Sequence, residues 1–458
     1  MNISFKKILK FIDAYRFADH ENTYIQSIFS LSIRSPILKM NTQSPKSSKV
    51  LMASMIGTMI EYFDFYIYST AAVLVFPKLF FPMSSPTAAT LESLATFALA
   101  FFARPLGAAL FGHFGDRIGR KATLVAALMT MGPSTVAIGL LPGYASIGVF
   151  APLLLAIFRF GQGLGLGGEW GGAILLATEN APAKKKAWYG MFPQLGAPLG
   201  FILSNGSFLL LSNYLTNEEF LSWGWRIPFI ASAILVFVGL YVRLNIEETP
   251  EFKKVIDSKE QVRIPMITVF TKHTKTLILG SLAATTTFVI FYLMTVFTLS
   301  WGTSHLGYQR EPFLMAQLIA ILFFGLGIPI SSMLADKFGT FKILIISTVI
   351  IFVFGLVFKP LFVSGNLTLT TFFLSLGLLV MGFTYGPLGT ALSNIFPTAV
   401  RYSGSSLAFT FAGILGASVA PYTATYLATA YGIEYVGYYL CGAAMISLIA
   451  FIMLKKYD

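Results

Sequence analysis

Twelve long apolar segments constrain the fold of this chain more than any other feature of its sequence. A helix needs about 20 mostly apolar residues to cross the hydrocarbon core of a bilayer. The sequence therefore predicts an all-α membrane protein with twelve transmembrane helices. The segments lie near residues 51–77, 88–113, 121–141, 147–178, 187–213, 226–245, 274–301, 312–335, 342–363, 367–393, 403–430 and 434–454.

The composition of the chain agrees with a membrane location. Of the 458 residues, 55% are hydrophobic and 11% are charged, whereas soluble domains carry about 25% charged residues. The net charge of +12 falls in short segments between the apolar runs, which argues against nucleic-acid binding. The single cysteine, Cys441, excludes a disulfide framework and a cysteine-based zinc site.

Metal and cofactor signatures are absent from the sequence. The four histidines stand far apart, and none has the HExxH spacing of a zinc enzyme. Gly163, Gly165 and Gly168 match a dinucleotide-binding pattern, but no strand precedes them, so close contact between helices explains them better. Because no nucleophile and base stand together, we expect no enzymatic activity, no cofactor and no metal.

The distribution of basic residues predicts the orientation in the membrane. If both termini are cytoplasmic, the segments on that side carry 26 of the 32 Lys and Arg residues, and the opposite segments carry four. Seven of the 26 lie in residues 243–275. Cytoplasmic loops carry an excess of Lys and Arg. We therefore expect both termini in the cytoplasm and a multi-pass protein of the bacterial inner membrane.

The longest charged connection, residues 246–272, divides the chain into two sets of six predicted spans. Ahead of the first span, the sequence leaves open whether translation starts at Met1 or at Met40. Five regions are expected. They are an N-terminal cytoplasmic extension at 1–50, a six-helix bundle at 51–245, a cytoplasmic linker at 246–272, a second six-helix bundle at 273–454 and a short cytoplasmic tail at 455–458.

The loops after the second and the eighth span share a pattern. The first reads GHFGDRIGRK and the second reads SMLADKFGTFK, with Asp116 and Asp336 at matching positions. This repeat indicates two halves of the same fold with a solute site between them. Glycine allows a tight reversal and aspartate can face a helix N-terminus, so we expect a cytoplasmic gate here. The gate residues are Gly112, Asp116, Arg117, Gly119, Arg120, Lys121 and Asp336.

GHFGDRIGRK resembles the loop signature of the major facilitator superfamily, and the resemblance extends along residues 51–454. Five segments are similar to its metabolite:proton symporter family, namely IEYFDFYIYSTAAVLVFPKLFFP, RPLGAALFGHFGDRIGRK, RFGQGLGLGGEWGGA, LSWGWRIPF and ETPEF. This resemblance implies the major facilitator fold and a substrate such as shikimate, a dicarboxylate, 2-oxoglutarate, citrate, proline or betaine. The second loop departs from the pattern at Thr340 and Phe341, so we expect a weaker gate there.

Charged residues within the predicted spans are candidates for the coupling machinery. Such a residue costs roughly 2.5–3.5 kcal/mol and marks a functional site by default. The helical rise of about 1.5 Å per residue puts Asp64 and Arg159 near the midplane, where they could pair. We expect Asp64, Arg159 and Glu61 to couple transport to protons, with Asp64 exchanging a proton as Arg159 approaches and withdraws. Arg159 can also bind an anionic substrate group, and the resemblance implies a coupling role for this arginine.

Arg104 and Glu169 lie at the same depth as Glu61, about 13 Å from the inner ends of their spans. We expect these residues to form an inner charge network that fixes the packing of the spans. Static bridges that serve folding alone remain the alternative for both sets of charges.

Polar residues elsewhere in the spans are candidates for the wall of a substrate cavity. Each can equally form a hydrogen bond between helices. They are Gln162, Gln194, Asn205, Tyr292, Tyr385 and Asn394.

These features predict a secondary active transporter. We expect proton symport of a small polar metabolite by alternating access, with an organic acid as the leading substrate class. The expected partners are the substrate, protons and the lipid bilayer, with no nucleic acid, and the expected assembly is a monomer. A proline or betaine symporter, a proton-coupled exporter and a non-transporting membrane receptor are the alternatives.

Overall fold

The computed structural model describes residues 45–115, 120–244 and 265–455, and the regular elements of these residues are all helices. We refer to residues 45–244 as the first half and to residues 265–455 as the second half. The first half contains α2 (Pro45–Leu74), α3 (Phe76–Phe80), α4 (Pro86–Gly115), α5 (Arg120–Leu140), α6 (Tyr144–Ile147), α7 (Phe150–Thr178), α8 (Lys186–Tyr214), α9 (Asn217–Glu219) and α10 (Arg226–Leu244).

The second half repeats this succession of long helices. Two π-helical turns, Leu293–Phe297 and Ile414–Ser418, continue α13 into α14 and α19 into α20. The elements are α12 (Pro265–Lys272), α13 (Thr274–Tyr292), α14 (Thr298–Ser304), α15 (Arg310–Phe338), α16 (Thr340–Leu356), α17 (Phe358–Phe362), α18 (Leu367–Asn394), α19 (Arg401–Gly413), α20 (Ala420–Ala430) and α21 (Glu434–Leu454).

In the described part of the chain, eleven helical segments are long and apolar enough to cross a membrane. They correspond to eleven of the twelve predicted spans. The remaining prediction, residues 342–363, falls on α16, an apolar helix of 17 residues, and on the short α17. Seventeen residues rise only about 26 Å, which is at the lower limit for crossing the hydrocarbon core.

Large apolar side chains cover the outward sides of the helices. On α10, Ile234, Phe237 and Tyr241 follow one another at helical spacing and are exposed, whereas Ser232 and Arg243 are buried. Exposed apolar surface of this extent is unfavourable in water. The outer side of the helix therefore suits lipid, and its polar residues face the protein interior.

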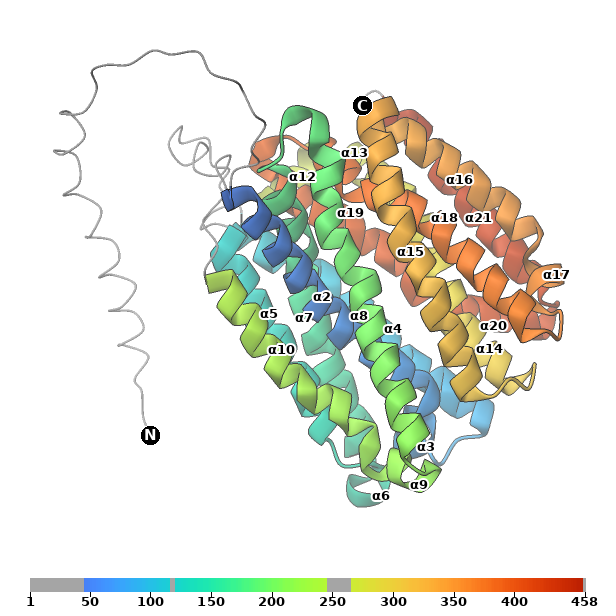
Figure 1. Ribbon diagram of the computed structural model, residues 1–458. Coiled ribbons are helices and arrows are strands. Elements are labelled where there is room, and N and C mark those ends of the chain that lie inside the picture. Colours follow the sequence, from blue (N-terminus) through green and yellow to red (C-terminus); the bar gives the residue numbers. More distant parts are fainter. Residues whose placement is uncertain (1–44, 116–119, 245–264, 456–458) are drawn as a thin grey trace, which may run out of the picture. The chain divides into compact units, whose positions relative to one another are not determined.

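Packing is closest within each half. In the first half α2 packs on α8, and α7 packs on α4 and α5; in the second half α15 packs on α18, and α16 packs on α21. Contacts between the halves run mainly along α8 with α15 and along α4 with α19. Figure 1 shows α8 and α15 side by side. The boundary between the halves is thus formed by long helices from both.

Glycines bring α7 close to its neighbours. A Cβ atom at Gly163 would overlap the backbone of Ala100, and one at Gly168 would overlap the side chain of Phe111, both on α4. A Cβ atom at Gly165 would approach the backbone of α5. The prediction that these small residues permit close helix contact is confirmed.

Candidate functional site

Asp64 lies on α2 and is fully buried. Its Oδ1 atom accepts a hydrogen bond of 2.5 Å from the hydroxyl of Ser232 on α10. Its Oδ2 atom accepts a hydrogen bond of 3.0 Å from the hydroxyl of Thr135 on α5. Three helices of the first half therefore meet at this carboxyl group. Because both donors are neutral hydroxyls, protonation of Asp64 breaks no ion pair.

Gln162 connects Asp64 to Arg159. The Gln162 side chain accepts a hydrogen bond of 2.9 Å from Arg159 Nη1 and donates one of 2.7 Å to the Thr135 hydroxyl. That hydroxyl is the one that donates to Asp64. Among the ion pairs of the described residues, none joins Asp64 to Arg159. The expected direct pair is replaced by a chain of hydrogen bonds, because Gln162, one turn further along α7, binds both sides.

Aromatic rings surround the rest of the Arg159 guanidinium group. Its Cζ atom lies 4.3 Å from the ring centroid of Phe65 and 3.9 Å from that of Tyr68. Its Nε and Nη2 atoms are buried without a hydrogen-bond partner. A desolvated cation–π contact is worth about 2 kcal/mol. Arg159 is thus a buried cation that is held by rings and one amide rather than by a carboxylate.

Arg243 binds both acidic residues of the expected inner network. Its Nη1 and Nη2 atoms lie 2.8 and 3.1 Å from the carboxylate oxygens of Glu169. Its Nη2 atom lies 3.3 Å from Glu61 Oε1. By sequence, Arg243 lies at the end of the predicted span 226–245 and is counted among the cytoplasmic basic residues of 243–275, and the structure corrects that count. The physical reason is that α10 continues to Leu244 and carries this side chain into the interior, where it is 4% exposed.

Arg104, the other basic residue of the expected inner network, forms no ion pair with Glu61 or Glu169 among the described residues. Its Cζ atom lies 4.5 Å from the ring centroid of Phe65 and 4.6 Å from that of Phe101. Its Nε atom is buried without a hydrogen-bond partner, and none of the ion pairs of the described residues includes it. Helical rise gives the depth of a residue, but the rotation of α4 about its axis directs Arg104 to the rings.

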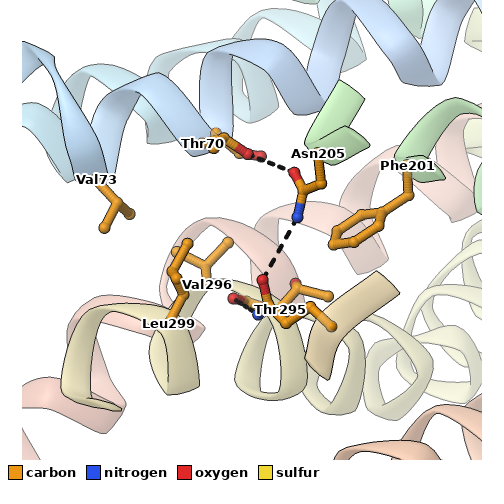
Figure 2. A pocket seen from close by; sticks show the side chains of 9 residues that line it. Thr70, Val73, Phe201, Asn205, Thr295, Val296 and Leu299 are labelled. Carbon is orange, nitrogen blue, oxygen red and sulfur yellow. Dashed lines mark hydrogen bonds between the residues drawn. The ribbon is translucent and has the colours of Figure 1, made fainter. Parts of the chain in front are cut away.

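A small pocket lies where the two halves meet (Figure 2). Asn205 accepts a hydrogen bond of 2.7 Å from the Thr70 hydroxyl and donates one of 3.4 Å to Gln317. Gln317 belongs to the second half, and the other two residues belong to the first. The predicted cavity residue Asn205 therefore lines a pocket with both polar and apolar walls. The lining residues are Ser69, Thr70, Val73, Phe201, Asn205, Thr295, Val296, Leu299 and Gln317.

Two other predicted cavity residues, Gln194 and Tyr385, connect the halves directly. The Gln194 side chain accepts a hydrogen bond of 2.9 Å from the Trp170 indole and donates one of 2.7 Å to the backbone oxygen of Tyr385. The Tyr385 hydroxyl forms a hydrogen bond with that of Tyr62. Both side chains thus form interhelical hydrogen bonds in this conformation.

The remaining predicted cavity residues lie in different surroundings. Tyr292 is buried among aromatic rings, with centroids 5.7 Å from Phe97 and 5.6 Å from Phe101. Gln162 belongs to the connection between Asp64 and Arg159 rather than to the pocket. Asn394 is exposed at the last residue of α18, so the structure does not place it in the interior.

The predicted gate residue Asp336 joins the two halves. Its carboxylate oxygens accept hydrogen bonds of 2.9 Å each from the backbone N–H groups of Ala187 and Trp188, at the N-terminus of α8. Close by, the Thr390 hydroxyl donates a hydrogen bond of 3.2 Å to the backbone oxygen of Lys186. An aspartate at a helix N-terminus is the arrangement that the sequence predicts here.

The other predicted gate residues belong to the first loop. Lys121 donates a hydrogen bond of 2.6 Å to the backbone oxygen of Leu244. A Cβ atom at Gly112 would contact Ser403 of the second half. Three further gate residues and the side chain of a fourth lie outside the described part of the chain. These are Asp116, Arg117 and Gly119, and the side chain of Arg120.

Membrane-length apolar helices, buried charges and polar groups at the boundary between two halves define a multi-pass membrane transporter. The family model of the Major Facilitator Superfamily matches residues 54–421, and the chain belongs to this superfamily. The resemblance of the loop signature is thereby confirmed.

Relatives with transport functions in their names match about nine tenths of the chain. The chain is 58% identical over 411 residues to the inner membrane metabolite transport protein YhjE of Escherichia coli, with 89% of this chain and 93% of that protein covered. It is 35% identical over 415 residues to the shikimate transporter of Escherichia coli, with 90% and 95% covered. It is 33% identical over 431 residues to the proline/betaine transporter of Salmonella typhimurium, with 90% and 84% covered.

Solved structures agree with the fold. The proton:xylose symporter XylE superimposes with a TM-score of 0.71 at 16% identity, with 91% of this chain and 96% of that chain covered. At this identity the likeness concerns the fold alone.

Proposed function

We propose that the protein is a proton-coupled symporter that carries a small polar metabolite, with an organic acid as the leading class, across the bacterial inner membrane by alternating access. The proposal includes twelve spans in two six-helix bundles, at 51–245 and 273–454, with both termini in the cytoplasm and a monomeric carrier. The 58% identity to an inner membrane metabolite transport protein supports the location. The fold shared with a proton:xylose symporter is compatible with symport.

The observation that carries the proposal is the setting of Asp64, a fully buried carboxyl group whose oxygens accept, among the described residues, from the hydroxyls of Ser232 and Thr135 alone. Burial favours the neutral form of a carboxyl group, and a nearby cation favours the charged form. Asp64 is open to both influences, because Arg159 is connected to it through Gln162 and is not bound to it directly. A small helix movement that brings the Arg159 guanidinium group nearer favours the charged form of Asp64. A movement that withdraws it favours the protonated, neutral form.

This setting distinguishes Asp64 from the other buried acids of the first half. Glu61 and Glu169 are both held by Arg243, so a proton on either would weaken an ion pair. We therefore assign the proton to Asp64 and a packing role to the Arg243 network. In the proposed cycle Asp64 takes up a proton on the outer side, and Arg159 approaches and displaces it on the inner side.

Transport into proteoliposomes tests the proposal. Labelled shikimate, dicarboxylates, citrate, proline and betaine are supplied singly, with and without an inward proton gradient. Accumulation of one compound above its outside concentration only under the gradient is the expected result. Gradient-driven efflux without accumulation would favour the exporter instead, and no movement of any compound would favour the receptor.

An osmolyte symporter remains the second candidate, since the chain is 33% identical to a proline/betaine transporter. The same panel separates the candidates. Gradient-driven uptake of proline or betaine, without uptake of any organic acid, would favour the osmolyte symporter.

A further inference from the structure

Two buried arginines, Arg104 and Arg159, contact the ring of the same residue, Phe65. The Cζ atoms of Arg104 and Arg159 lie 4.5 and 4.3 Å from the ring centroid of Phe65. Arg104 is 3% exposed and Arg159 is not exposed at all. Neither forms an ion pair with an acidic residue of the described chain. Two positive charges are therefore buried close together without a carboxylate against them.

The nearby acidic residues are already engaged. Arg243 holds Glu61 and Glu169, and Asp64 accepts from two hydroxyls. An uncompensated buried charge is strongly unfavourable, since desolvation costs several kcal/mol per ion. A negative charge that enters from outside the protein is the natural partner for such a cation.

Of the two arginines, Arg104 is the one at the boundary between the halves. Its Nη1 atom lies 3.7 Å from the position of a Cβ atom at Gly413, which ends α19 of the second half. Tyr292 of the second half packs against Phe101 with ring centroids 5.6 Å apart, and Arg104 lies over the ring of Phe101. Arg159, by contrast, contacts Phe65, Tyr68 and Phe97, which all belong to the first half.

Aromatic contacts connect the wall of the pocket between the halves to the surroundings of Arg104. Phe201, which lines the pocket, packs against Tyr66 with ring centroids 5.3 Å apart, and Tyr66 packs against Phe65, the ring that Arg104 contacts. Thr295, another lining residue, lies about one helical turn after Tyr292. The rings of Phe201, Tyr66 and Phe65 thus form a continuous contact between the wall of the pocket and the Arg104 guanidinium group.

We propose that Arg104 binds the carboxylate group of a small organic acid at the boundary between the two halves. Phe65 and Phe101 stabilise the guanidinium group and leave its Nε edge without a protein acceptor. That edge matches the two oxygens of a carboxylate, because guanidinium–carboxylate pairs are planar and bidentate. The inference rests on the proposed transport function and deepens it, since it names the substrate class and the residue that recognises it.

Binding to the purified full-length protein in detergent tests the proposal without any proton gradient. Mono-, di- and tricarboxylates are compared with their neutral amides and with inorganic phosphate, and the shift in thermal unfolding gives the affinity. We expect at least one carboxylate to bind the wild type tenfold or more tightly than its amide. Equal affinity for acid and amide, tighter binding of phosphate, or no binding of any carboxylate would overturn the proposal.

Variants at the same position sharpen the test. Arg104→Gln is expected to bind the acid no more tightly than the amide, whereas Arg104→Lys keeps part of the preference because it keeps the charge. Arg310→Gln is the matched control, since Arg310 lies at the start of α15 and pairs with Glu311, and its preference should equal that of the wild type. An undiminished preference in Arg104→Gln contradicts the proposal. If that variant fails to fold, the wild-type acid and amide comparison and the Arg104→Lys variant still decide.

The outcome is separable from that of the proposed function. Carboxylate preference in binding, together with uptake that ignores the proton gradient, would overturn proton coupling and leave the Arg104 site standing. Gradient-driven uptake of a compound, together with equal binding of acids and their amides, would overturn the Arg104 site and leave proton coupling standing.

Discussion

Arg243 on α10 and Glu169 on α7 share two hydrogen bonds, of 2.8 and 3.1 Å, inside the first half. The same guanidinium group reaches Glu61 on α2 and donates to the backbone oxygen of Leu124 on α5. One side chain therefore joins four helices. Because each of its contacts requires a fixed distance and direction, it determines how these helices are rotated toward one another.

Replacing Arg243 should destabilise the protein more than any surface ion pair does. Arg243→Met leaves two buried carboxylates without their partner, and removal of one partner from a buried pair costs about 3–5 kcal/mol. Thermal unfolding of the purified protein measures the effect. Lys359→Met is the control, because the pair of Lys359 with Glu434 is 54% and 36% exposed and should contribute about 1 kcal/mol or less. Equal stability of the two variants would refute the assignment.

Asp64→Asn should abolish uphill transport while it preserves exchange. The amide has the size of the carboxyl group and can accept from one of the two hydroxyls, so the fold is retained, but the proton site is lost. Accumulation under a proton gradient and exchange of labelled for unlabelled substrate are measured in the same proteoliposomes. Glu92→Gln, at an exposed acid on α4, is the control. Wild-type accumulation by Asp64→Asn would remove the coupling role.

Thr135 offers a test of the connection between Asp64 and Arg159. Thr135→Val keeps the side-chain volume but removes the hydroxyl that donates to Asp64 and accepts from Gln162. We expect a loss of about 1–3 kcal/mol of stability, since buried polar groups lose a partner, and weaker gradient-driven accumulation. Thr135→Ser retains the hydroxyl and should behave like the wild type. Identical coupling in both variants would show that the connection has no role in transport.

Asp336→Asn should loosen the contact between the halves at the N-terminus of α8. The charged acceptor for the N–H groups of Ala187 and Trp188 is lost, and hydrogen bonds to charged groups contribute about 1.5–3 kcal/mol. A cysteine in place of Thr390, in a background where Cys441 is serine, reports the opening through its rate of maleimide labelling. A change of about 1.4 kcal/mol corresponds to a tenfold faster rate. Glu311→Gln, at the other end of α15, should leave labelling unchanged, and an equal rate in both variants would contradict the gate.

Sequence alone determined the class of the protein. In lipid, a run of about 20 apolar residues must satisfy its backbone hydrogen bonds within itself, which a helix does. Helices and a membrane location therefore follow from composition and length. The depth of Asp64, Glu61 and Glu169 also follows, because each residue advances a fixed distance along the helix axis. The structure accordingly brings Glu61 and Glu169 onto one arginine.

Tertiary structure decided which charges meet. Arg243 lies at the end of the predicted span 226–245 and counts by sequence among the cytoplasmic basic residues, although packing turns its side chain into the interior. Helix rotation directs Arg104 toward aromatic rings. Rotation and the close contacts of the glycine-rich α7 also place Gln162 between Asp64 and Arg159. Those quantities are set by packing between segments far apart in the chain, which no local pattern encodes.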